Sequence, residues 1–194
     1  MAEYRIANIL DMADVIGEKN LKVLLSGFFC PRNKELQHFV RENAYDFARK
    51  KISVTYLIID EDNLIAAVFA LAHKAIEISN EGLSGAKRRK INRYAVLDAS
   101  SDSYTVSAFL IAQLGKNYAP GMENSITGNA LIDAAFEILV KVRHDIGGGI
   151  VFLECEDKPG LLRFYQDGQN GFMPFSERYA APDKIKYIQL FQFF

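Results

Sequence analysis

The sequence is poor in cysteine, and this scarcity limits the chemistry that it can support. Only two of its 194 residues are cysteine, Cys30 and Cys155, and they lie far apart. Because no Cys-x-x-Cys pair and no Cys/His cluster occurs, a zinc site has little support and no metal is expected. Cys155 falls within a predicted strand, where a buried, reduced thiol is the simplest interpretation. A reducing cytoplasm is therefore the expected setting.

Net charge and long apolar runs are also lacking. Lys plus Arg number 23 and Asp plus Glu 24, which gives a net charge of −1. This balance excludes a global basic field for nucleic acid or membrane. No apolar run reaches membrane-spanning length, and the first residues, MAEYRIAN, lack a signal pattern, so no membrane partner is expected. Apolar residues make up 49% of the chain, enough for a core, and the length suits one domain over residues 1–194.

Hydrophobic spacing and turn residues predict a mixed order of helices and strands. We expect helices over residues 4–16, 33–51 (with Asn33 as the N-cap) and 128–146, and a short helix around Phe164 and Tyr165. We expect strands over residues 21–30, 53–60, 64–73, 105–114, 150–155, 172–179 and 184–194. Residues 77–103 are interpreted as a polar loop. The order predicts a mixed α/β sheet with helices on both faces.

One stretch of this order predicts an anion site. Residues 105–114 form an apolar strand, residues 115–127 a loop with glycine and proline, and Gly128 begins an amphipathic helix. The first amide groups of a helix have no partner within it, and the helix dipole adds partial positive charge there. Such a helix start holds a pyrophosphate without a cluster of arginines.

Three local motifs follow one another in this region. QLGK (residues 113–116) ends the strand, SITGNALI (residues 125–132) joins the loop to the helix, and LLRFY (residues 161–165) precedes Asn-Gly-Phe at 170–172. Their order resembles the GNAT N-acetyltransferase superfamily from about residue 21 to the end. The resemblance implies a mixed, mostly antiparallel sheet that is splayed between its fourth and fifth strands. Acetyl-CoA would lie in the splay.

The resemblance also assigns residues to the cofactor. They are Gln113, Leu114, Gly115, Lys116, Ser125, Ile126, Thr127, Gly128, Asn129, Ala130 and Lys158. The sequence departs from the family pattern in three places. The family loop reads Q/R-x-x-G-x-G/A, but residues 123–128 are ENSITG. Lys158 replaces a common asparagine, and two extra residues separate Tyr165 from Gly171.

For catalysis, the resemblance implies that Tyr165 faces the departing sulfur of the thioester. A phenol has a pKa near ~10 and an alkyl thiol near ~8.5, so full proton transfer is uphill by roughly 2 kcal/mol. A hydrogen bond from Tyr165 to the sulfur is therefore the expected role, and simple packing of the ring is the alternative. A backbone N–H near Leu114 or Gly115 would bind the oxygen as charge develops on it.

The candidates for the base that deprotonates the amine are Glu154 and Glu156. They share one face of the strand with Phe152 by two-residue periodicity, and burial would raise the pKa of either carboxyl. The alternatives are a salt-bridged Glu154 with a solvated Glu156, and a base function supplied by water.

The expected function is acetyl-CoA-dependent transfer of acetyl to a primary amine of a small molecule or peptide. A basic run, residues 87–90 with Arg93, raises the alternative of a toxin-type enzyme that acetylates aminoacyl-tRNA. The near-neutral total charge argues against extensive nucleic-acid contact, and the run also suits a solvated surface. The divergent loop leaves open a non-catalytic acyl-CoA-binding module. The apolar C-terminal strand is a candidate contact for a homodimer.

Overall fold

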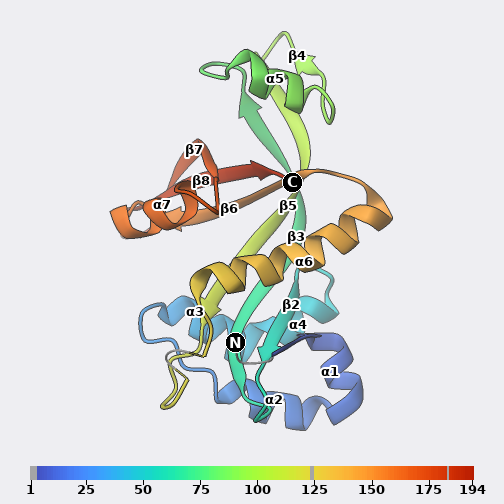
Figure 1. Cartoon of the computed structure of the whole chain (residues 1–194), viewed down its shortest axis with the longest axis vertical. Helices are drawn as coiled ribbons and strands as arrows, with labels where there is room; N and C mark the ends of the chain where they lie inside the picture. The colour runs from blue at the N-terminus through green and yellow to red at the C-terminus, as the bar shows by residue number, and fades with distance from the viewer. Residues whose placement is uncertain (1–3, 123–124, 183) are drawn as a thin grey trace. The chain divides into compact units, whose positions relative to one another are not determined.

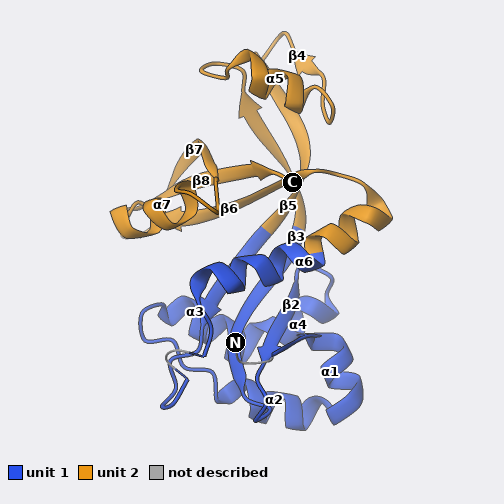
Figure 2. Cartoon of the chain, in the orientation of Figure 1, with its two compact units in different colours: residues 1–72, 111–138 blue, residues 73–110, 139–194 orange. Residues whose placement is uncertain are grey.

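The computed structural model describes residues 4–122, 125–182 and 184–194 (Figure 1). The chain forms two compact units, and each is described by itself (Figure 2). Unit 1 contains residues 1–72 and 111–138, and unit 2 contains residues 73–110 and 139–194. Three elements, strands β3 and β5 and helix α6, run from one unit into the other.

In chain order, unit 1 begins with a short strand, and most of its helices follow before the β2–β3 hairpin. Its elements are β1 (Arg5–Asn8), α1 (Ile9–Ile16), α2 (Glu18–Ser26), α3 (Lys34–His38), the π-helical turn η1 (Phe39–Asn43), α4 (Ala44–Arg49), β2 (Val54–Ile59), and parts of β3 (Ile65–Ser79), β5 (Ser103–Lys116) and α6 (Gly128–Ile146). The pairs β1–β2 and β2–β3 are antiparallel. The helices bury Leu21, Leu25 and Val40 against β-strand residues such as Leu57 and Val68.

Unit 2 holds the other ends of β3 and β5 together with the C-terminal strands. Its own elements are α5 (Gly85–Ile91), β4 (Leu97–Asp98), β6 (Ile150–Glu156), α7 (Pro159–Gln166), β7 (Met173–Ala180) and β8 (Ile185–Phe193). Strand β8 pairs antiparallel with both β6 and β7. The described strands are hydrogen-bonded in the order β1-β2-β3-β5-β6-β8-β7, and β4 pairs with β5. This mixed, mostly antiparallel sheet with helices confirms the predicted fold class.

Elements with strong periodicity are confirmed. Asn33 caps α3, where its side-chain oxygen accepts a hydrogen bond from the Leu36 amide at 2.9 Å. The hairpin over residues 53–73 forms as β2 and β3, and the Asp60 carboxylate closes its turn by accepting from the Asp62 and Leu64 amides. Helix α6 ends where the Gly147 amide bonds the Arg143 carbonyl at 2.8 Å, with Gly147 at φ +78°. The predicted strands at 105–114, 150–155, 172–179 and 184–194 also form.

Three predictions are wrong. Residues 21–30 were expected to form a strand, but residues 18–26 form α2. The reason is spacing, since Leu21 and Leu25 lie one turn apart on the buried face of α2, whereas Val23 is 67% exposed. Residues 5–8 form β1 ahead of a shorter α1, and the polar segment 77–103 contains α5 and β4. None of the helices in the described part of the chain is both long and apolar enough to cross a membrane.

Candidate active site

The predicted phosphate loop and the start of α6 lie in unit 1. Residues 123–124, part of the expected motif, fall outside the described residues. Thr127 acts as the cap of α6, because its hydroxyl oxygen accepts a hydrogen bond from the Ala130 amide at 3.1 Å. The Ser125 hydroxyl donates to the Met122 carbonyl at 2.8 Å, and Ile126 is buried. The loop is therefore anchored at Ser125 and Ile126, and the exposed Thr127 stands at the helix start.

The predicted cofactor residues 113–116 end strand β5 and are partly exposed. Gly115 has a packing reason of its own, since a Cβ at this position would overlap the Leu36 side chain of α3. Asn117 follows directly and is buried. Its side chain donates to the Ile65 carbonyl at 2.7 Å and accepts from the amides of Phe29 and Ala119. Asn117 thus fixes the point at which the chain leaves β5 and enters the loop.

Two cationic groups flank an aromatic ring beside this strand end. The Arg32 guanidinium carbon lies 4.9 Å from the centre of the Tyr118 ring, and Lys116 Nζ lies 5.7 Å from it. Such contacts stabilise cations on aromatic faces. They place positive charge next to residues 113–116, which favours an anionic ligand there.

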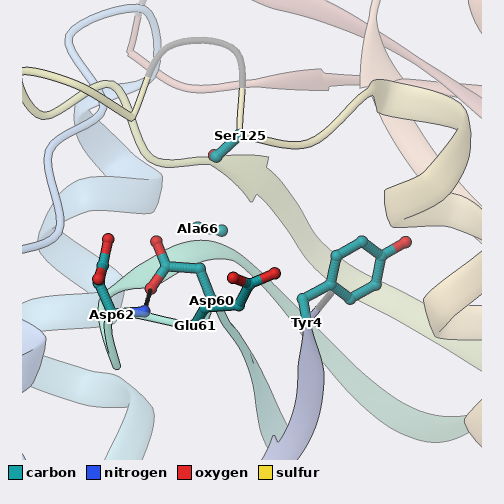
Figure 3. Close-up of a pocket in the computed structure, with 6 residues that line it drawn as sticks. All are labelled: Tyr4, Asp60, Glu61, Asp62, Ala66 and Ser125. Carbon is teal, nitrogen blue, oxygen red and sulfur yellow. Dashed lines mark hydrogen bonds between the residues drawn. The ribbon is translucent and has the colours of Figure 1, made fainter. Parts of the chain in front are cut away.

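A small pocket of about 190 Å³ in unit 1 has the opposite charge. Figure 3 shows the carboxylates of Asp60, Glu61 and Asp62 gathered at the pocket, with Tyr4 and Ser125 also lining it. An anion entering the pocket would meet these carboxylates at close range. The pocket is therefore unsuited to phosphate.

Tyr165 lies in unit 2 on α7, against strand β6. Its side chain is 8% exposed and contacts the rings of Phe164 and Phe172, with centroid distances of 4.9 and 6.0 Å. Burial, with a smaller contribution from the neighbouring Cys155 thiol, raises the pKa of Tyr165 well above its usual range. The phenol therefore stays protonated at neutral pH and is available as a hydrogen-bond donor.

Glu154 lies on the opposite face of β6 from Tyr165. Neighbouring residues of a strand point to opposite faces, and it is Cys155 that lies beside Tyr165. Arg178 Nε donates to Glu154 Oε2 at 2.7 Å, and Gln189 Nε2 donates to Oε1 at 2.5 Å. Partial burial raises the pKa of Glu154, but the hydrogen bonds from Arg178 and Gln189 outweigh it, so the net pKa is lowered. A carboxylate held in this way is a weak base.

Glu156 and Lys158 pair with each other at the end of β6. Lys158 Nζ lies 2.5 Å from Glu156 Oε2, and the Lys158 side chain is 63% exposed. Lys158 also precedes α7, and its carbonyl accepts from the Leu162 amide. This geometry is that of a partly solvated ion pair, so the base function of Glu156 and the cofactor contact of Lys158 stay predictions.

Residues 87–90 of the basic run lie in helix α5 of unit 2, and Arg93 lies in the turn that follows it. Ser84 caps the helix by accepting from the Lys87 amide, and buried Ile91 anchors it in the unit's core. Lys90 Nζ lies 5.4 Å from the centre of the Phe193 ring. Within the described residues, no ion pair is formed by three further cations of this run: Lys87, Arg89 and Arg93. From residue 82 to residue 97 the sequence contains no acidic residue, so their charge is not neutralised locally.

Several residues that hydrogen-bond to the predicted site residues, or fix the chain beside them, are not marked by any motif in the sequence. Asn117, Arg178 and Gln189 are polar residues far in sequence from the groups that they bond, and no local motif marks them. Asn170 belongs to the Asn-Gly-Phe motif, but the motif does not indicate the bond from its side chain to the Phe164 carbonyl. Among the residues that the structure describes, no group of three or more His, Cys, Asp or Glu side chains is placed to hold a metal.

Comparison with solved structures identifies neighbours that match nearly the whole chain. The toxin AtaT, solved in complex with acetyl-methionyl-tRNAfMet, matches with a TM-score of 0.66 and 16% identity over 98% of this chain and 95% of its own. A structure described as a bacterial toxin gives 0.65 and 17% over 100% and 92%. A tyrosine-to-phenylalanine variant of KacT gives 0.63 and 13% over 95% and 94%.

The sequence by itself finds no such match, because neither a family model nor a curated protein resembles it. The likeness is therefore one of three-dimensional structure. AtaT and KacT are GNAT-fold acetyltransferases, and their structures superpose on nearly all of this chain. This chain accordingly has the GNAT fold, which is the fold that the motifs at 113–116, 125–132 and 161–172 predict.

Proposed function

We propose that the chain is an acetyl-CoA-dependent N-acetyltransferase whose acceptor is the amino group of an aminoacyl-tRNA. The observation that carries the proposal is the likeness to AtaT over nearly the full length of both chains, because AtaT has been solved with acetyl-methionyl-tRNAfMet. A related complex, AtaTR, has been solved with acetyl-CoA. This reverses the order of the two acceptors expected from the sequence, in which a small molecule or peptide came first.

Helix α5 supports a polyanionic acceptor. Lys87 and Arg89 of α5, with Arg93 in the turn that follows it, offer unneutralised positive charge in unit 2. RNA presents a regular series of phosphates. A small amine has no use for such a surface. The −1 net charge of the chain is compatible with this role because the positive charge is local.

The start of α6 supports phosphate binding. The Thr127 hydroxyl oxygen accepts from the Ala130 amide, which leaves its proton free to be donated to a phosphate oxygen. The partial positive charge of the helix start adds to this donor. Residues 113–116, with the cations at Tyr118, complete the features of unit 1 that favour an anionic cofactor.

Tyr165 would assist the chemical step. The acceptor nitrogen attacks the thioester carbonyl, the carbon–sulfur bond breaks, and its electron pair goes to the sulfur. A protonated phenol stabilises that developing thiolate by donating a hydrogen bond, and its raised pKa makes complete transfer of the proton less favourable. The proton of the amine leaves to water or to a carboxylate. Glu154 is already bonded to Arg178 and Gln189, which favours water over Glu154 for this task.

The test is an acetyl-transfer assay with labelled acetyl-CoA. The purified chain is supplied with aminoacyl-tRNA, uncharged tRNA, free amino acids or simple amines, and both acid-precipitable label and released thiol are measured. We expect label on aminoacyl-tRNA alone. Equal transfer to free amines would restore the small-molecule acceptor. Binding of acetyl-CoA in calorimetry without transfer to any acceptor would indicate a non-catalytic binding module.

A further inference from the structure

The segment after Tyr165 closes the C-terminal end of α7. The last carbonyl groups of a helix have no partner within it. Here three successive carbonyls each receive a hydrogen bond from residues 167–172. The Asp167 amide donates to the Arg163 carbonyl at 2.9 Å, and the Phe172 amide donates to that of Tyr165 at 2.9 Å. Between them, the Asn170 side chain donates through Nδ2 to the Phe164 carbonyl at 2.7 Å.

This cap is buried and tightly turned. Asn170 is 5% exposed and Phe172 is 2% exposed. Gly168 and Gly171 have φ values of +52° and +57°, which side chains rarely adopt, and they let the chain turn back under the helix. If the Asn170 side-chain amide were removed, the Phe164 carbonyl would lose its hydrogen-bond donor. Leaving a buried carbonyl unsatisfied costs free energy, so removal of this bond is costly.

The same segment also contacts the Tyr165 ring. The Phe172 ring meets the Tyr165 ring edge to face at an interplanar angle of 79°, and the Phe164 ring meets it at 66°. Both the backbone and the ring of Tyr165 are therefore fixed by this segment. Its carbonyl is bonded by the Phe172 amide, and its ring is enclosed by neighbours whose backbone is fixed by Asn170.

We infer that Asn170 is a positioning residue for Tyr165. Its side-chain amide fixes the Phe164 carbonyl and the loop that delivers Phe172, and so sets the direction in which the Tyr165 hydroxyl points. The inference rests on the proposed role of Tyr165 in acetyl transfer. It predicts that the Asn170 amide matters for turnover only while the Tyr165 hydroxyl is present.

A double-mutant cycle tests this coupling. Asn170→Ala, Asn170→Asp and Tyr165→Phe are made singly, and each Asn170 variant is combined with Tyr165→Phe. Asp keeps the shape of asparagine but carries no N–H at neutral pH, so both substitutions remove the same donor. We expect each Asn170 variant to lower kcat about tenfold and to leave the Kd for acetyl-CoA within twofold. In the Tyr165→Phe background, the same substitutions should change kcat less than twofold.

A matched control separates positioning from general stability. Asn8 caps α1 in unit 1 by accepting from the Leu10 amide at 2.9 Å, and no catalytic task falls to it. Asn8→Ala should lower the melting temperature while kcat stays at the wild-type value. If Asn170→Ala does not fold, Asn170→Asp is compared with the wild type and with its Tyr165→Phe double variant in the same way.

The outcomes distinguish the inference from the proposed function. If Tyr165→Phe slows turnover and the Asn170 effects multiply with it, Asn170 does not act through Tyr165 and only the inference is overturned. If Tyr165→Phe turns over like the wild type, both the role of Tyr165 and the inference are overturned. Wild-type kcat in both Asn170 variants would also overturn the inference.

Discussion

Arg178 holds Glu154 with two nitrogens, since Nε lies 2.7 Å and Nη2 2.6 Å from the same carboxylate oxygen, Oε2. The two residues come from β7 and β6, which are separated by β8, and Gln189 of β8 bonds the second oxygen. A side chain that was a candidate for the catalytic base therefore links three strands. Its location explains why its pKa is lowered rather than raised.

Replacing Glu154 by glutamine should affect stability more than turnover. A carboxyl whose pKa is lowered on folding contributes stability above its unfolded value of about 4.5, and this contribution is lost as the pH falls through the folded value. Glu154→Gln should melt a few degrees lower than the wild type at pH 7, and the two melting curves should converge below about pH 4. Thermal denaturation across this pH range measures the effect. A drop in kcat of about 100-fold, with loss of the acidic limb of the pH–rate profile, would instead identify Glu154 as the base.

A carboxylate at the start of α6 should block cofactor binding. Gly128→Glu places bulk and negative charge at the helix start, where a phosphate is expected to lie. We expect the Kd for acetyl-CoA to rise at least tenfold in calorimetry. Gly27→Glu adds the same side chain at an exposed helix end of unit 1, where φ is −75° and the nearest atom to the new Cβ is the Leu24 carbonyl oxygen at 3.4 Å. This variant should bind acetyl-CoA normally. Unchanged affinity in Gly128→Glu would move the phosphate site away from α6.

Neutralising the cations of the basic run that form no ion pair within the described residues should selectively weaken binding of an RNA acceptor. The variant changes Lys87, Arg89 and Arg93 to glutamine and leaves Lys90, which contacts Phe193, and Arg88, which donates to the Asn80 carbonyl. Each lost phosphate contact should reduce the slope of log K against log salt concentration by about one. We expect KM for aminoacyl-tRNA to rise about tenfold or more at moderate salt, with acetyl-CoA binding unchanged.

The control for this variant is an equal loss of charge elsewhere. Lys19, Lys34 and Lys51 are exposed residues of unit 1 and can be changed to glutamine together. Salt titration of both triple variants separates a local effect from net charge. Equal weakening by the two sets would remove α5 from the acceptor surface.

Cys155 should make the fold sensitive to alkali. Burial, and to a smaller extent the charges of Asp157 and Glu156, raise the pKa of its thiol from 9.0 to about 11. A group with a raised folded pKa contributes stability that is fully present below the unfolded value and is lost as the pH rises through the folded one. The wild type should therefore lose melting temperature between about pH 9 and 11, and Cys155→Ala should lose less over the same interval. Parallel loss in both proteins would contradict the assignment.

The sequence predicted the elements whose pattern is strong and local. Strand β5 and helix α6 have continuous apolar or helical spacing, and Asn33 marks its helix start. Helix α2 overlaps a run of apolar residues that is typical of a strand, and its helical signal is limited to the four-residue spacing of Leu21 and Leu25. Helix α5 was hidden because it buries little besides Ile91 and is otherwise charged.

The site was predictable only where a motif is contiguous. Tyr165 and the start of α6 come from short stretches that can be compared with a known pattern. The partners of Glu154 depend instead on the register of β6 with β8 and of β8 with β7, which places Gln189 opposite both Glu154 and Ser176. No sequence window contains that information, because 35 residues separate Glu154 from Gln189.

The position of β8 has a consequence for the order in which the protein is made. Strand β8 lies between β6 and β7, although both precede it in the chain. When the ribosome has synthesised β6, α7 and β7, these two strands still lack the strand that lies between them. They can be connected in the sheet only after residues 185–193 have been synthesised. The Glu154–Arg178 link spans that gap, so it too is established only after the central strand arrives. Assembly of this part of unit 2 must therefore follow the synthesis of β8.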